Sequence, residues 1–266
     1  MIKLCFSTLG CTNRSLSDVI SLAECYGIKA LEIRGLGGEL QNEKIVDFSS
    51  ENILKTKQKF SDAKILPLVL GTSVSFHNGS SFFQSLAEGK NSLELASRIG
   101  FSAIRVFGNS VFGKEDDCIR RVAFGLRDLC LYADKLGVSV LLEVHGDFNT
   151  AERLFPIAEY CADSNSFGLI WDICHTHEIY GENWQVFYDS LAPYIRHVHI
   201  KDVKKGKQVL PGDGELPICA IADYIIHHGY DGYFSLEWEK YWHRELPDIE
   251  FALDKFFYLF SKNCLS

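Results

Sequence analysis

Residues 168–177 read GLIWDICHTH, an apolar run that turns polar at Asp172 and then supplies two histidines. A short, continuous apolar run is typical of a strand that is buried on both faces, as strands of parallel sheets are. A buried carboxylate is unfavourable unless it is paired, hydrogen-bonded or bound to a metal. We therefore expect Asp172 at the end of a buried strand, where other polar side chains meet it.

Runs of this kind recur along the chain, and a stretch of helical periodicity follows each one. The predicted strands are residues 3–7, 30–35, 64–70, 103–108, 138–145, 167–172, 195–202 and 232–239. The stretches LSDVISLAECYG and CIRRVAFGLRDLCLYADKLG between them have amphipathic spacing, and Gly137 is a helix stop. Eight βα units in 266 residues predict a single (β/α)8 TIM barrel over residues 1–266, with a doubly wound sheet as the alternative.

The composition argues against several classes of protein. Hydrophobic residues make up 47% and charged residues 23%, which is ordinary for a globular protein. The net charge of −8 disfavours a nucleic-acid partner and suits a small substrate. No apolar segment is long enough to span a membrane, and the N-terminus does not resemble a signal peptide. The nine cysteines include no C-x-x-C pair and predict reduced thiols in a cytoplasmic protein; a homo-oligomer is left open.

Four ionisable residues occupy equivalent places on the last four predicted strands. They are Glu143 in LLEVHGD, Asp172 in LIWDICH, His199 in HVHIKD and Glu237 in SLEWEK. Each is about one βα unit from the next, so all four are expected at the C-terminal ends of adjacent strands, where barrels carry their active sites. Carboxylate and imidazole ligands together suit one Mn, Mg, Co or Zn ion, with Cys174 as a minor alternative ligand. The competing interpretation is a set of buried polar groups that only satisfy one another.

Further polar residues are expected near these strand ends. Lys201 shares the inward side of its strand with His199, and we weigh contact with substrate or an enolate for it. His145 is either a partner beneath the metal or a substrate contact. Additional candidates for substrate binding at the rim are Glu32, Arg34 and His77. His177 and His197 are expected to be structural, and Glu239 is expected beyond its strand end.

A family resemblance rests on several of these motifs together. LLEVHGDF, WDICHTH, IRHVHIKD, PGDGELP and GYDGYFSLEWEKYWH, in this order, resemble the xylose isomerase-like TIM barrels, grouped as sugar phosphate isomerases and epimerases of carbohydrate metabolism. The resemblance runs from FSTLG at residue 6 to the last helix. In the ketose 3-epimerases a Glu, Asp, His and Glu bind one divalent metal such as manganese, which implies that role for Glu143, Asp172, His199 and Glu237. It also implies that the two glutamates are the catalytic acid/base pair and that His175 contacts substrate.

The chain also departs from these relatives. Asn149 stands where the ketose epimerases have a second carboxylate, and Lys205 stands where they have an arginine. The chain also resembles inosose dehydratase, and more distantly endonuclease IV, whose three zinc ions need histidines and an Asp-x-His pair that are missing here. Because of these absences and the acidic net charge, a phosphodiesterase is disfavoured.

The prediction is therefore a metal-dependent isomerase or epimerase that abstracts a proton beside the carbonyl of a keto-sugar or sugar phosphate. The alternatives are an inosose dehydratase-type lyase, a phosphodiesterase and a non-catalytic sugar-binding protein. The long loop over residues 201–217 carries Lys204, Lys205 and Lys207. These lysines either bind a phosphate group of the substrate or form a solvated surface.

Overall fold

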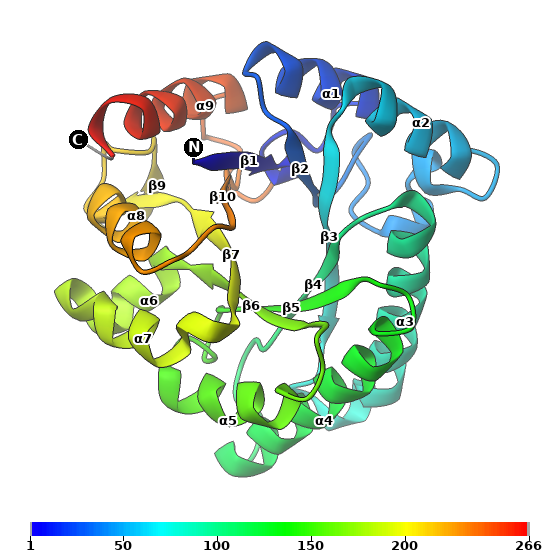
Figure 1. The fold of residues 1–266 in the computed structure, drawn as a ribbon, viewed down its shortest axis with the longest axis vertical. Coiled ribbons are helices and arrows are strands. Elements are labelled where there is room, and N and C mark those ends of the chain that lie inside the picture. Colours follow the sequence, from blue (N-terminus) through cyan, green and yellow to red (C-terminus); the bar gives the residue numbers. More distant parts are fainter. Residues whose placement is uncertain (1, 265–266) are drawn as a thin grey trace.

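The computed structural model describes residues 2–264, and its centre is a closed barrel of parallel strands (Figure 1). The barrel order is β1-β10-β7-β6-β5-β4-β3-β2. The strands are β1 (Lys3–Ser7), β2 (Ala30–Ile33), β3 (Leu66–Ser75), β4 (Ala103–Phe107), β5 (Ser139–Glu143), β6 (Phe167–Asp172), β7 (Ile195–Ile200) and β10 (Tyr233–Leu236). Every predicted strand is present, and the predicted (β/α)8 barrel is confirmed. Pairing of β1 with both β2 and β10 closes the sheet, which excludes the doubly wound alternative.

Helices surround the barrel between successive strands (Figure 1). They are α1 (Leu16–Cys25), α2 (Ile53–Ala63), α3 (Phe82–Ile99), α4 (Glu115–Ala133), α5 (Ala151–Cys161), α6 (Ile173–Tyr180), α7 (Trp184–Leu191), α8 (Ile218–His227) and α9 (Ile249–Tyr258). The helices cover the outward faces of the strands. Trp171, for example, points outward from β6 and is fully buried against Trp184, Phe187 and Tyr188 of α7. Apolar burial between helix and strand is the main favourable contribution to such packing.

The barrel interior changes from apolar to charged along the strand direction. A small apolar cluster of Val69, Ala103, Leu141 and Ile170 fills one layer. Side chains alternate across a strand, so the next inward positions lie two residues further along. Those positions are Gly71, Arg105, Glu143 and Asp172. On the β3–β6 side of the barrel, the charged groups therefore lie one layer above this apolar cluster.

The predicted loop over residues 201–217 contains a short hairpin of β8 (Asp202–Lys204) and β9 (Lys207–Val209). Asp202 is 1% exposed and organises this segment. Its carboxylate accepts hydrogen bonds from the backbone N–H groups of Val203, Gly212, Gly214 and Leu216 at 2.9–3.2 Å. Four such bonds to a charged acceptor hold the loop in one arrangement.

Two findings concern expectations drawn from the composition, one about membrane-spanning segments and one about the cysteines. No helix within residues 2–264 is long and apolar enough to cross a bilayer. Cys219 of α8 and Cys264 are joined by a disulfide with 4.7 Å between their Cα atoms, so the prediction that all nine thiols are reduced is wrong for this pair. The segment after α9 packs beside α8, a proximity that a separation of 45 residues hides in the sequence. The other seven cysteines are free.

Candidate active site

The four residues that the sequence singled out meet at the C-terminal end of the barrel. Glu143 ends β5, Asp172 ends β6, His199 lies on β7, and Glu237 directly follows β10. All four are at most 2% exposed. Each places one potential ligand atom within 4.8 Å of the others. His199 Nδ1 lies 3.4 Å from Glu237 Oε1 and 4.0 Å from Glu143 Oε2.

Asp172 has two functions, one for each carboxylate oxygen. Oδ1 accepts hydrogen bonds from the backbone N–H groups of Cys174 at 2.9 Å and His175 at 3.4 Å, which caps the N-terminus of α6. Oδ2 faces the barrel interior, 2.8 Å from Nζ of Lys201. The abrupt change from strand to helix at this residue therefore explains why a carboxylate follows the apolar run.

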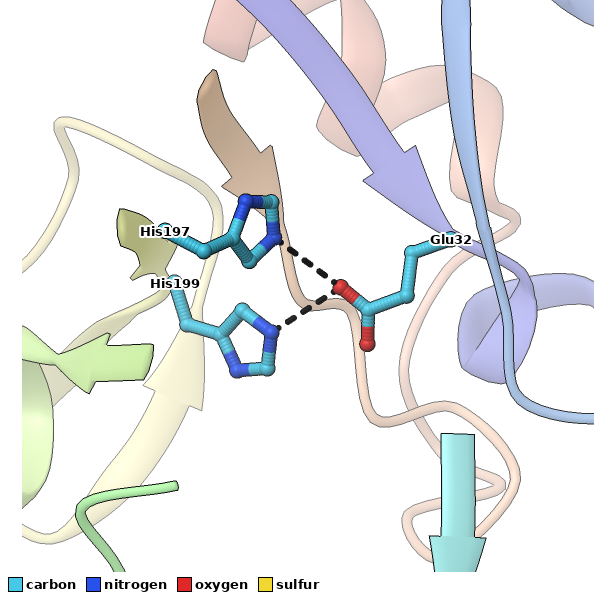
Figure 2. A group of neighbouring side chains, drawn as sticks. All are labelled: Glu32, His197 and His199. Carbon is cyan, nitrogen blue, oxygen red and sulfur yellow. Dashed lines mark hydrogen bonds and ion pairs between the residues drawn. The ribbon is translucent and has the colours of Figure 1, made fainter. Parts of the chain in front are cut away.

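Glu32 lies inside the barrel, which corrects its predicted place at the rim. It is fully buried, and its Oε2 atom accepts from His197 Nε2 at 3.2 Å and His199 Nε2 at 3.0 Å (Figure 2). Ser235 Oγ also donates to it at 3.3 Å. This contact orients the His199 ring so that Nδ1 faces Glu143 and Glu237. The rim prediction failed because Glu32 pairs in register with Val69 of the apolar cluster, and this level of the barrel lies one layer below the strand ends.

Two buried cations stand among the carboxylates. Nη1 of Arg105 donates to Glu143 Oε2 at 2.8 Å and lies 3.9 Å from Glu237 Oε1. Its guanidinium also lies over the Phe107 ring, 4.1 Å from the centroid. The sequence interpretation missed Arg105, although a charged residue inside the apolar strand AIRVF was a usable signal.

Lys201 is the second cation, and it lies among three carboxylates. Its Nζ is 2.8 Å from Asp172 Oδ2, 3.0 Å from Glu237 Oε2 and 2.9 Å from Glu239 Oε1. Lys201 is only 5% exposed. A buried ammonium group requires such partners, so these contacts account for its position without a substrate.

The mutual fields of these groups shift their proton affinities. Burial lowers the pKa of His199, but Glu32, Glu237 and Glu143 outweigh burial and raise that pKa to about 10. Burial raises the pKa of Glu237, yet Lys201, His199 and Arg105 hold it well below its usual range. Glu237 is therefore ionised at neutral pH.

The donor set suits a divalent metal ion. Three carboxylates and one imidazole are the ligands that Mn²⁺, Zn²⁺ and related ions take in proteins. His199 Nδ1 is buried, has no hydrogen-bond partner within residues 2–264 and faces Glu143 and Glu237, so loss of its proton would let it complete a ligand set with them. Cys174 does not belong to any potential ligand group in the part of the chain that the structure describes. Burial raises the pKa of its thiol to about 12, so it is not a thiolate at neutral pH.

A hollow of about 370 Å³ opens above these groups. Its lining includes Glu143, Glu237, Arg105, His145 and Arg34. The ring of His175 packs edge-on against that of His145, with 4.7 Å between the centroids. His145 Nδ1 and His175 Nε2 are buried without a hydrogen-bond partner among residues 2–264. Burial and Lys201 lower the pKa of His175 to about 4, so it is neutral and able to accept a hydrogen bond.

Some candidates from the sequence lie away from this hollow. His77 is half-buried, is 3.1 Å from Ser75 Oγ through Nδ1, and does not line the hollow. Lys204, Lys205 and Lys207 are exposed on the β8–β9 hairpin and do not line it either. A solvated surface is therefore the better interpretation of the three lysines.

The chain is thus a (β/α)8 barrel that gathers carboxylate and histidine side chains at the C-terminal ends of its strands, where barrel enzymes carry their active sites. Residues 20–255 match the family described as the xylose isomerase-like TIM barrel, and the chain belongs to it.

The curated relatives include enzymes of two kinds. The chain is 27% identical to fructoselysine 3-epimerase of Escherichia coli O157:H7 over 124 residues, which are 44% of each chain. It is 28% identical to inosose dehydratase of Lacticaseibacillus casei over 169 residues, 53% of this chain and 55% of that one. The alignments thus span about half the length of the curated relatives.

The fold is also shared with solved structures. The crystal structure of the IOLI protein with a bound zinc atom superposes with a TM-score of 0.83, at 21% identity, over all of both chains. At this identity the similarity establishes the fold alone.

Proposed function

We propose that this protein is a divalent-metal-dependent epimerase or isomerase of a small keto-sugar, in which Glu143 and Glu237 are the acid/base pair. The observation that carries the proposal is the placement of these two buried carboxylates. They come from β5 and β10, which two other strands separate in the barrel, and both line the same hollow. Two carboxylates that approach one space from different strands can serve opposite faces of a substrate carbon.

Glu143, Asp172, His199 and Glu237 would hold the ion. A divalent ion in this position polarises a substrate carbonyl and stabilises negative charge beside it. The IOLI protein, which shares this fold, has a bound zinc atom in its crystal structure.

The chain's own groups would then perform the proton transfers. One glutamate, as the carboxylate, would remove the proton from the carbon beside the carbonyl. The other, entering the step as the carboxylic acid, would give its proton to the opposite face of that carbon. Arg105 holds Glu143 at 2.8 Å and thereby fixes the direction of its carboxylate. His145 lines the hollow, and His175 packs against it from behind the lining. Both have a buried nitrogen without a hydrogen-bond partner among residues 2–264, and these nitrogens suit hydrogen bonds to substrate hydroxyl groups.

A dehydratase is the second candidate, and the match to inosose dehydratase favours it. The first step is the same, but the second carboxyl group would protonate a departing hydroxyl group on the next carbon. The product therefore separates the two candidates: an epimerase keeps all the atoms of its substrate, whereas a dehydratase releases water.

The test is conversion of keto-sugars and keto-inositols in deuterated water with Mn²⁺ present. We expect deuterium on the carbon beside the carbonyl. Glu143→Gln and Glu237→Gln should each lower turnover by at least about a hundredfold, the usual scale for a general base. Glu245→Gln is the matched control, because that side chain is 77% exposed and lies outside the site. Full conversion with the original hydrogen retained at that carbon would contradict the proposal and indicate hydride transfer.

A further inference from the structure

Arg34 is a buried cation that forms no ion pair within residues 2–264. It directly follows β2, is 7% exposed, and is anchored through its backbone N–H, which donates to Thr8 Oγ1 at 2.9 Å. Nη1 of its guanidinium donates to the carbonyl oxygen of Leu40 at 3.2 Å, and Nη2 donates to Ser73 Oγ at 3.0 Å. Both acceptors are neutral. Two bonds use two of the five N–H donors that a guanidinium carries.

The other two buried cations of the site differ in this respect. Arg105 contacts Glu143, and Lys201 contacts Asp172 and Glu237. Arg34 makes no ion pair within residues 2–264. Burial and the positive charge of Arg105 lower the pKa of Arg34 to about 10, while Glu143, Glu32 and Glu237, which form no ion pair with it, act in the opposite direction. A buried charge without a partner is unfavourable, and proteins keep such a group where a ligand compensates it.

The residues around Arg34 leave room for its side chain to reach the hollow. Its side chain crosses Gly71, where an added Cβ atom would lie 2.6 Å from Arg34 Cδ. Arg34, Ser73, Asn109 and Arg105 all line the hollow that Glu143 and Glu237 also line. One cleft therefore combines the two carboxylates with a guanidinium that has unused N–H donors, an exposed hydroxyl group and an amide.

We propose that Arg34, assisted by Ser73, binds an anionic group of the substrate, so that this protein acts on an acidic keto-sugar and not on a neutral one. The anion is a carboxylate or a phosphate, both of which match the planar fork of a guanidinium. This inference rests on the proposed function for the reaction itself. Arg105 is less suited to the role because Glu143 occupies its Nη1 atom, and the hairpin lysines lie outside the hollow.

The first experiment compares hydrogen exchange in deuterated water for D-fructose, D-fructose 6-phosphate and 2-keto-D-gluconate. The wild-type protein should prefer one of the two anionic compounds, and the preferred one identifies phosphate or carboxylate. Arg34→Gln should lower kcat/KM for that compound, mainly through KM, by about 10- to 100-fold more than for D-fructose, the range expected of a hydrogen bond to a charged group. Arg34→Lys should recover part of the loss. Arg244→Gln, an arginine beside a neighbouring hollow, is the matched control.

The second experiment does not depend on turnover. Inorganic phosphate or glycolate, compared with KCl at equal ionic strength, should raise the Tm of the wild-type protein and of Arg244→Gln but not that of Arg34→Gln. Equal use of neutral and anionic compounds by the wild type, or equal losses for all three in Arg34→Gln, would overturn the anion assignment. If no keto compound exchanges hydrogen, the proposed function fails. The Tm shifts then decide the anion site separately: a shift lost in Arg34→Gln upholds it, and the absence of any shift in the wild type refutes it. If Arg34→Gln does not fold, Arg34→Lys and the wild-type shift decide.

Discussion

Replacing Lys201 by methionine tests how much its ammonium group stabilises the buried carboxylates around it. Methionine keeps the length of the side chain but removes the ammonium group that contacts Asp172, Glu237 and Glu239 at 2.8–3.0 Å. Asp172 and Glu237 are at most 3% exposed, so each loses a cationic partner inside the barrel where water cannot replace it. Removing one partner of a buried ion pair usually costs about 3 to 5 kcal/mol. At about 2 to 4 °C per kcal/mol for a domain of this size, the Tm should fall by about 6 to 20 °C.

Differential scanning calorimetry of protein treated with EDTA would measure this loss. Lys240→Met is the matched control, because Lys240 pairs with Asp248 at the surface, and its Tm should change by only about 2 °C. Adding Mn²⁺ should restore more stability to Lys201→Met than to the wild type, since the ion compensates the same carboxylates. A Tm within about 2 °C of the wild type in metal-free Lys201→Met would refute the reasoning.

Three further predictions concern the metal, its support and the loop. Metal analysis should find one divalent ion per chain, which raises the Tm, and Glu237→Gln should weaken that rise; three tightly bound zinc ions would contradict the single site. Glu32→Gln should lower metal affinity by about 10- to 100-fold in titration calorimetry, because Glu32 orients the metal-ligand candidate His199. An affinity equal to that of Glu24→Gln, a control at an exposed position, would exclude this role. Asp202→Ala should raise the rate of proteolysis within residues 201–217 by at least about tenfold, because it removes the hydrogen bonds that hold the loop. Asp213→Ala, at an exposed position of the same loop, is the control, and equal proteolysis rates for the two variants would show that Asp202 does not organise the loop.

The repeating architecture explains why the four central residues were predictable. Strands of a (β/α)8 barrel recur at nearly constant spacing, and their ends lie on one face. A residue at the end of one strand is therefore a spatial neighbour of the residue at the end of the next. Glu143, Asp172 and His199 follow this rule on β5, β6 and β7, which are adjacent in the barrel. Glu237 follows it after β10, the next strand in the closed order.

Contacts across the barrel are not encoded in that spacing. Glu32 lies on β2 and His199 on β7, with β1 and β10 between them in the barrel. Neither strand's sequence indicates that these two side chains meet. The same holds for the ion pairs of Arg105 and Lys201, which depend on side-chain length and direction in a shared interior. Sequence parity predicts the inward direction of Lys201 but does not indicate the three carboxylates that surround its ammonium group.

The cations also determine how stability and chemistry are related in this barrel. The layer above Val69, Ala103, Leu141 and Ile170 is charged, and so it cannot be stabilised by apolar burial. It depends on internal compensation, which Arg105 and Lys201 supply through short contacts to Glu143 and Glu237. The same contacts orient both glutamates toward the hollow. Because one set of contacts serves both purposes, a substitution of either cation should change stability and turnover together, whereas a substitution of Arg34 should act mainly on substrate binding.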